Sequence, residues 1–331
     1  NKVVPSSWRK FRDVALYWLK MGVDGFRYDM AEMVPVEFWS FMNSSIKMEN
    51  PDAFIMAEVY NPDLYRTYIH KGKMDYLYDK VDFYDGLKHI MKGYGWSDHI
   101  PVVQNGLQDI EHNMLHFLEN HDEQRIASPE FVGNPEIGKP AMVVSATIST
   151  SPTMIYFGQE VGEPAAENAG FGSASRTSIF DYVGVPNHQR WVNDKKFDGG
   201  QLKPEEAALR DFYKRLLNFT ITSEALMGAY REIHFYNKEI TENYNHRVLS
   251  YVRWSENQKL IIVSNFDTNV HCSFDLKIPV DIINQWQLSQ GTYKLKDVLY
   301  GHTNSLKIEN GEGHISIELN PLESFIFELK S

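Results

Sequence analysis

The sequence predicts an α/β fold of parallel strands, followed by an antiparallel β-sandwich. Up to about residue 229, short apolar runs alternate with helix-like stretches, as in successive βα units. From about residue 230, strand-like runs of alternating apolar and polar residues are separated by Gly, Asn and Asp. We therefore expect two domains, residues 1–229 and residues 230–331.

The first domain is predicted to contain five strand-then-helix units. Trp8, Phe11, Val14 and Trp18 recur at helical spacing, so an opening helix is expected to be capped by Ser6 or Ser7 and to end at Gly22. The expected strands lie near 23–28, 53–59, 74–79, 113–122 and 153–160, and the later helices near 36–47, 61–72, 83–93, 141–149 and 204–218.

A charged residue follows each expected strand: Asp29, Glu58, Asp79, Asp122 and Glu160. In a TIM-type (β/α)8 barrel, catalytic residues lie at this carboxyl end of the strands. Such a barrel needs eight strands, and this sequence supplies about five. The expected fold is therefore the later part of a barrel, about strands 4 to 8, followed by the sandwich.

The composition excludes some classes of function. The formal net charge is -11, without a run of Lys or Arg, so a nucleic-acid partner is not expected. No apolar stretch approaches the roughly 20 residues that a membrane-spanning helix needs, so no membrane partner is expected. Cys272 is the only cysteine, which excludes an intrachain disulfide and a thiolate metal cluster.

Three groups of residues are candidates for catalysis. Arg27 precedes Asp29 by two residues and so lies on the same side of a strand, where it can hold that carboxylate ionised. Glu58 follows an apolar run, and an apolar setting favours the protonated form that a proton donor needs. His121 and Asp122 end a third strand. Each of the first two groups alone fits a structural role equally well, whereas the third is harder to explain in that way.

The joint pattern favours chemistry. Asp29 and Glu58 are separated by one strand–helix–strand repeat, which places them on neighbouring strands. Carboxyl groups there can approach to the roughly 5–5.5 Å that retaining glycosidases need. Similar constellations on several strands of one sheet are not expected by chance.

These motifs resemble those of the α-amylase family, glycoside hydrolase family 13. "GFRYD" resembles the family's nucleophile motif, "AEVY" its acid/base motif and "FLENHDEQR" its third carboxylate motif, while "PTMIYFGQE" resembles the motif of the last barrel strand. The four motifs occur in the family's order and are followed by a region similar to its C-terminal sandwich.

The resemblance implies a role for each matching residue. Asp29 would be the nucleophile, Glu58 the general acid/base and Asp122 the stabiliser of the transition state. Arg27 would orient Asp29, and His121 would bind the same sugar. These roles imply a retaining hydrolase of α-1,4-glucosidic bonds in starch or maltodextrins.

The sequence also departs from the family's pattern. Glu32 and Met33 occupy positions where starch hydrolases of the family often carry a Lys-His pair that binds acceptor-side sugars. The family's early motifs are absent, so we expect an N-terminal half of the barrel to be a separate or cleaved chain that stays docked. The isolated chain is then expected to be inactive. No cofactor and no metal site are expected within this chain; calcium is expected, if anywhere, in the N-terminal half.

Two other functions stay open. A transglycosylase or glucanotransferase would use the same residues, with a sugar hydroxyl in place of water. A non-catalytic glycan-binding or partner-supporting relative would belong to another class, but such relatives typically lose the carboxylates. The α-glucan is the expected partner in each case, and the compartment is left open.

The loop at 162–182 is polar and ends in the aromatic residues Phe180 and Tyr182. Aromatic faces stack on the apolar surfaces of sugar rings, so this loop is a further candidate for lining a sugar cleft.

Overall fold

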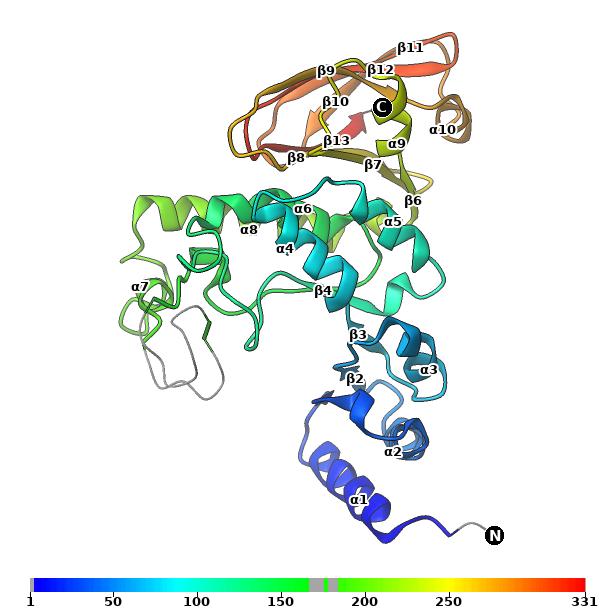
Figure 1. The fold of residues 1–331 in the computed structure, drawn as a ribbon, viewed down its shortest axis with the longest axis vertical. Helices are drawn as coiled ribbons and strands as arrows, with labels where there is room; N and C mark the ends of the chain where they lie inside the picture. The colour runs from blue at the N-terminus through cyan, green and yellow to red at the C-terminus, as the bar shows by residue number, and fades with distance from the viewer. Residues whose placement is uncertain (1–2, 167–175, 178–183, 331) are drawn as a thin grey trace.

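A computed structural model describes residues 3–166, 176–177 and 184–330 of the chain. Figure 1 shows the C-terminal β domain stacked on the helices of the preceding domain, with the N-terminal helix at the opposite end of the molecule. The first domain contains a five-stranded parallel sheet in the order β1-β2-β3-β4-β5. These strands are β1 (Gly25–Tyr28), β2 (Phe54–Ala57), β3 (Tyr76–Tyr78), β4 (Met114–Phe117) and β5 (Thr153–Met154). The five predicted parallel strands are confirmed, although each is shorter than its apolar run.

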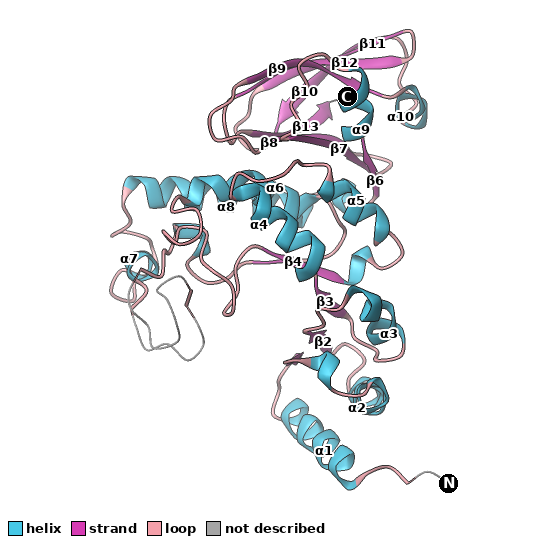
Figure 2. Cartoon of the chain, viewed as in Figure 1, coloured by secondary structure: helices cyan, strands magenta, loops and turns pink. Residues whose placement is uncertain are grey.

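Helices connect successive strands, as Figure 2 shows by colour. They are α1 (Ser6–Lys20), α2 (Val36–Glu49), α3 (Tyr65–His70), α4 (Asp85–Met91), α5 (His99–Gly106), α6 (Gly138–Thr147), α7 (Pro186–Val192) and α8 (Pro204–Thr222). The cap predicted for α1 is wrong, because Pro5 precedes the helix and no side chain caps it. Gly22 has φ +96° directly beyond α1, where a left-handed residue ends a helix readily.

The first two strands approach each other closely because Gly25 has no side chain. A Cβ atom at Gly25 would lie 2.1 Å from the carbonyl oxygen of Phe54, its partner in β2. The resulting register pairs Tyr28 with Ala57, so the residues that follow both strands emerge at one edge of the sheet. This register therefore positions Asp29 and Glu58 side by side.

The C-terminal domain is an eight-stranded antiparallel sheet in the order β6-β7-β8-β13-β10-β11-β12-β9. Its strands are β6 (Ala229–Glu232), β7 (Val248–Trp254), β8 (Lys259–Asn265), β9 (Cys272–Ile278), β10 (Gly291–Asp297), β11 (Thr303–Glu309), β12 (Glu312–Leu319) and β13 (Ser324–Lys330), with two short helices, α9 (His234–Ile240) and α10 (Val280–Gln285). Figure 1 shows β9, β11 and β12 in one layer and β7 and β8 in the other. The sheet thus folds over its own apolar core, as the predicted sandwich requires.

The two domains share a second apolar core. Met142 of α6 and Phe212 of α8 belong to the same buried cluster as Tyr251 of β7 and Ile262 of β8. Figure 2 shows α6 and α8 lying beneath the layer of β7 and β8. The antiparallel sheet is therefore buried on its outer face as well, where it covers the helices of the parallel domain.

The buried side chain of Arg253 joins the two domains by hydrogen bonds. Arg253 is 1% exposed. Its guanidinium donates to the carbonyl oxygens of Ile148 at 2.6 Å, Thr147 at 3.3 Å and Gly228 at 3.2 Å, and also to that of Leu226. Burial lowers the pKa of Arg253, because the cation has lost its water. Carbonyls at the C-terminal end of α6 and before β6 replace that water.

None of the helices in the described ranges combines the length and the hydropathy that a bilayer crossing requires.

Candidate active site

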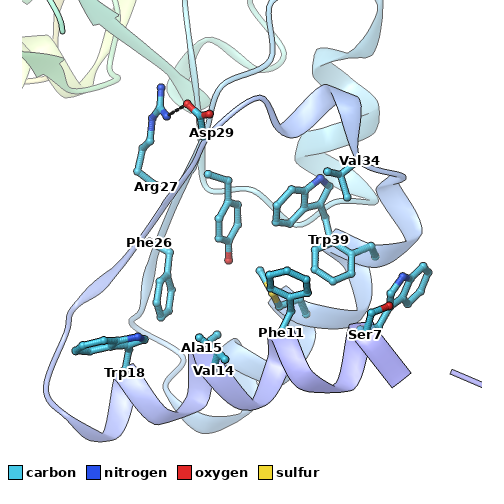
Figure 3. A pocket seen from close by; sticks show the side chains of 14 residues that line it. Ser7, Phe11, Val14, Ala15, Trp18, Phe26, Arg27, Asp29, Val34 and Trp39 are labelled. Atoms are coloured by element: carbon cyan, nitrogen blue, oxygen red, sulfur yellow. Dashed lines mark hydrogen bonds and ion pairs between the residues drawn. The ribbon is translucent and has the colours of Figure 1, made fainter. Parts of the chain in front are cut away.

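Arg27 joins two carboxylates that follow neighbouring strands. Its Nη1 donates to Asp29 Oδ1 at 2.5 Å, and its Nη2 donates to Glu58 Oε2 at 3.2 Å. Figure 3 shows the Arg27 side chain reaching along β1 to Asp29. The predicted pairing of Arg27 with Asp29 is confirmed, and the structure adds the bond to Glu58. One planar guanidinium thus fixes the relative position of both acids.

The pair of Arg27 and Asp29 favours the ionised form of the acid. The hydrogen bond from Arg27 lowers the pKa of Asp29, and the slight burial that opposes it is the smaller effect. Burial alone would lower the pKa of Arg27, but hydrogen bonds to Asp29 and Tyr78 and the charge of Glu58 leave it raised. Asp29 is therefore held as a carboxylate, the form that a nucleophile needs.

Glu58 has a drier environment than Asp29. The Glu58 side chain is 11% exposed, whereas the Asp29 side chain is 70% exposed. Glu58 Oε2 also accepts the backbone N–H of Met30 at 3.0 Å. Burial raises the pKa of Tyr60, and the neighbouring Glu58 carboxylate raises it further. Two acids in contrasting settings beside one arginine can divide the roles of nucleophile and proton donor.

Asp122 is presented by a turn beyond β4. Asn120 Oδ1 accepts the backbone N–H groups of Asp122 and Glu123, both at 2.8 Å, which tightens the chain after the strand. His121 Nε2 lies 3.1 Å from Asp122 Oδ2. The His121 ring therefore orients the carboxylate that projects from this turn.

The five residues predicted for the site all line one cavity of about 610 Å³. Its complete lining is Arg27, Asp29, Met30, Glu32, Met33, Glu58, Tyr60, Lys80, His121, Asp122 and Glu123. The structure thus brings together Asp29, Glu58, Asp122, Arg27 and His121 from three strand ends. Their individual roles stay predictions.

Several lining residues were missed by the sequence reasoning. Lys80 Nζ lies 3.3 Å from Glu123 Oε1 and 5.4 Å from the centre of the Tyr60 ring. Glu123 also accepts from Lys88 Nζ at 2.9 Å, and these two cations lower its pKa although burial opposes them. Lys80 and Glu123 directly follow the strand-end acids Asp79 and Asp122, so their positions in the sequence offered a signal.

Two of the strand-end acids do not reach the cavity. Asp79 is 1% exposed and its Oδ2 lies 3.4 Å from Nε2 of the buried His116. Burial raises the pKa of Asp79, and His116 counters this only in part. Glu160 lies in a single helical turn, Gln159–Val161, and lines a different cavity. A strand-end position alone therefore does not identify a site residue.

Glu32 and Met33 have different environments beside the cavity. Glu32 Oε2 accepts the backbone N–H groups of Tyr60 at 3.0 Å and Asn61 at 2.9 Å, so it supports the loop that follows β2. Met33 is 71% exposed at the mouth of the cavity. At the positions of the family's Lys-His pair, an anchoring carboxylate and a thioether thus lie beside the candidate catalytic acids.

The described part of the loop at 162–182 lies against the site. Tyr156 Oη donates to the Thr177 carbonyl at 2.7 Å, and Arg125 Nε donates to Thr177 Oγ1 at 3.3 Å. Arg176 Nη1 donates to the Asp122 carbonyl at 3.4 Å. Phe180 and Tyr182, the aromatic candidates of this loop, lie outside the described residues.

Within residues 3–166, 176–177 and 184–330, no three His, Cys, Asp or Glu side chains are grouped closely enough to hold a metal ion.

Comparison with protein families matches both parts of the chain. The family described as "Alpha amylase, catalytic domain" matches residues 2–198, and the one described as "Alpha amylase, C-terminal all-beta domain" matches residues 240–330. These matches identify the parallel domain as the later part of a (β/α)8 catalytic barrel and the antiparallel domain as the domain that follows it.

Individual relatives are distant and longer. Alpha-amylase 2 of Dictyoglomus thermophilum is 23% identical over 321 residues, which cover 93% of this chain and 48% of the relative. The α-1,4-glucan:maltose-1-phosphate maltosyltransferase of Cereibacter sphaeroides is 21% identical over 305 residues, covering 90% of this chain and 40% of the relative. The chain spans about half or less of the length of the curated relatives it matches.

A solved structure shows the same fold. The α-amylase of Geobacillus thermoleovorans in complex with acarbose superposes with a TM-score of 0.71 at 18% identity, covering 98% of this chain and 64% of that one.

Proposed function

This chain belongs to the α-amylase family, and from that premise we propose that it carries the catalytic carboxylates of a retaining glycosidase acting on α-1,4-glucans such as starch or maltodextrins. The observation that supports this most directly is the bridge from Arg27 to both Asp29 and Glu58 at the floor of one cavity. Such a bridge holds two carboxyl groups as near neighbours, which is the arrangement of retaining glycosidases.

The proposed reaction is a double displacement. An Asp29 oxygen attacks the anomeric carbon while Glu58 gives its proton to the leaving glycosidic oxygen, which leaves a glycosyl ester on Asp29. Glu58, now ionised, takes a proton from water as that water attacks the same carbon and releases Asp29. Asp122 and His121 bind hydroxyls of the sugar in both steps, and their bonds favour the oxocarbenium-like transition state.

The first test compares two aspartates that are each paired with an arginine. Asp29→Asn removes the nucleophile, so hydrolysis of maltohexaose should fall on the order of 10³-fold or more, and Glu58→Gln should act similarly. Asp109 is paired with Arg66 at 2.7 Å and does not line the cavity, so Asp109→Asn should leave the rate unchanged. Chromatography of the products measures each rate. Where the unsubstituted protein hydrolyses maltohexaose, an equal rate for Asp29→Asn would contradict the proposed mechanism.

A second candidate function differs only in the acceptor. One relative of the chain is named as a maltosyltransferase, and the exposed Met33 borders the cavity in place of a side chain that binds acceptor sugars in starch hydrolases. In a transglycosylase, the hydroxyl of a second sugar would attack the glycosyl ester in place of water. Products longer than the substrate, formed from maltotriose, would favour transfer over hydrolysis.

We also propose that further polypeptide of the barrel, beyond this chain, packs against β1 and completes the candidate active site. β1 is at one edge of the described sheet, and beside it lies an apolar cavity of about 490 Å³, seen in Figure 3 between α1 and β1. Phe11, Val14 and Trp18 of α1 line this cavity, although 61%, 54% and 49% of their surfaces are exposed. Arg27 and Asp29 border it too, so a covering segment would also shield Asp29 from water.

The active protein should therefore contain more barrel polypeptide than this chain. Intact-mass analysis of the active protein purified from its native source measures this directly. A longer chain, or a second polypeptide that stays bound, is expected. A monomer with the mass of this chain alone and full hydrolytic activity would contradict the proposal. Calcium binding stays a prediction attached to that additional polypeptide.

A further inference from the structure

The C-terminal domain contains a second cavity, of about 520 Å³, that shares no lining residue with the catalytic one. The start of β6, the turn between β7 and β8 and the C-terminal end of α10 form its walls. Its volume lies in the range of small-ligand sites. Because Trp254 and Trp286 both line it, we call it the tryptophan cavity.

The walls of the tryptophan cavity are held in place by the backbone. Trp254 ends β7 and pairs with Ala229 of β6 and Lys259 of β8. A Cβ atom at Gly228 would lie 2.1 Å from the Trp254 carbonyl oxygen, so only glycine allows this approach. Trp286 is the C-cap residue of α10, and its backbone N–H donates to the Ile282 carbonyl at 2.9 Å. The site is therefore preformed.

The two indole rings give the cavity an apolar wall with an unsatisfied donor. Their centroids are 6.3 Å apart with the planes at 68°. Trp254 is half-buried, whereas Trp286 is 3% exposed. The buried Nε1–H of Trp286 has no acceptor among the described residues. An unpaired buried donor is costly, and because this nitrogen is closed off from the surface, an acceptor reaches it only if the side chains over it move.

Neutral polar groups form the rim. Gln285 and Gln287 are exposed, and among the described residues their side-chain amides make no hydrogen bond. Glu256 and Lys259 offset each other in charge, and Lys259 Nζ donates to the Glu256 carbonyl at 3.3 Å. An amide presents donors and an acceptor together, which suits adjacent hydroxyls that both donate and accept.

These walls favour one class of ligand. A phosphate or another anion would need an excess of positive charge, which Glu256 cancels beside Lys259, and a purely apolar ligand would leave the amides without partners. A pyranose ring has an apolar C–H face for the indoles and hydroxyls for the exposed amides. We propose that the tryptophan cavity is a non-catalytic binding site for glucose units of an α-glucan. The choice of an α-glucan over other sugars rests on the proposed function.

The experiment observes Trp286 directly. The indole N–H signals of the seven tryptophans are recorded by 1H–15N NMR and assigned with single Trp→Phe variants. Maltotriose is titrated into the full chain carrying Asp29→Asn, which prevents turnover, and cellotriose is titrated in parallel. The Trp286 signal should shift and saturate at millimolar maltotriose. Gln285→Ala combined with Gln287→Gly should weaken this binding about tenfold, because two side-chain partners are lost.

Gln287 has φ +56°, so glycine removes its amide without straining the backbone. Gln290→Ala is the matched control: this exposed glutamine of the same segment does not line the cavity and should leave the affinity unchanged. A Trp286 signal that stays in place throughout the maltotriose titration would overturn the binding site, and equal shifts with cellotriose would overturn its α-glucan class. Hydrolysis is assayed separately on the unsubstituted protein. If the protein with its additional barrel polypeptide bound maltotriose at Trp286 but did not hydrolyse maltohexaose, the binding site would stand and the proposed function would be refuted.

Discussion

The two domains differ in how completely they bury their strands. The antiparallel sheet encloses its own core, in which Leu276, Ile278 and Ile315 are 0% exposed. The parallel sheet buries one flank under helices, but the α1 side of β1 is still lined by exposed apolar side chains. The candidate catalytic acids belong to this less enclosed domain. The difference suggests that the C-terminal domain contributes stability, while the site depends on what covers β1.

The strongest test of this difference concerns the buried interface arginine. Arg253→Met keeps an unbranched apolar stem but leaves several buried carbonyl groups without their donor. The free energy of unfolding should fall by about 3 kcal/mol, because each unsatisfied buried group is costly. Urea denaturation measures this loss.

Arg231→Met is the control for that variant. Arg231 lies on the neighbouring strand β6 and pairs with Asp281 at 3.3 Å, but its side chain is 57% exposed. An exposed ion pair of this kind contributes less than about 1 kcal/mol. If both variants lost the same free energy of unfolding, the hydrogen bonds of Arg253 would not be what stabilises the interface.

A smaller loss is expected in the parallel sheet. Gly25→Ala places a Cβ atom 2.1 Å from the Phe54 carbonyl oxygen, so β1 must move away from β2, at about 1–3 kcal/mol. Gly106→Ala meets no atom within 4 Å and, in a helix, should be neutral or stabilising by up to about 1 kcal/mol. Thermal unfolding compares the two. Equal melting temperatures for both variants would show that the register of β1 does not need glycine.

The smallest effect concerns the charge of Asp29. Arg27→Met removes the main cause of the lowered pKa, so the pKa of Asp29 should rise toward its ordinary value of about 3.9. An acid with a lowered pKa stabilises the fold above its ordinary pKa and loses this contribution as the pH falls through the lowered one. The variant should therefore lose little at pH 7, since Asp29 is mostly exposed.

Carboxyl 13C NMR titration measures the pKa of Asp29 without requiring activity. Arg66→Met serves as the control, because it should raise the pKa of Asp109, which Arg66 lowers, and leave Asp29 unchanged. An Asp29 pKa that did not move in Arg27→Met would contradict the bridge from Arg27.

The sequence predicted where the parallel strands occur more accurately than how long they are. Each parallel strand lies within its expected apolar run, but β5 spans only Thr153–Met154 of the expected 153–160. An apolar run indicates that its residues are buried, whereas a strand also needs a neighbouring strand to pair with along its length. For the same reason, the alternating runs predicted β7 to β13, but neither β6 nor the position of β13 between β8 and β10.

The candidate site was likewise predicted only in part. The position of Asp29, Glu58, Asp122, Arg27 and His121 at strand ends follows from the sequence, because the order of apolar run and charged residue is local. Whether a strand-end acid turns into the shared cavity or away from it depends on neighbours that are distant in the sequence. Asp79 illustrates this, since it pairs with His116 of the next strand.

By itself, the sequence determined the order of the five parallel strands, the presence of two domains and the acids that follow the strands. These features depend on periodicity and on residues close together in the chain. Only the tertiary structure decided that Arg27 also reaches Glu58, that Tyr60, Lys80 and Glu123 join the cavity, and that Trp254 meets Trp286. Such contacts depend on how remote segments pack, which no local pattern records.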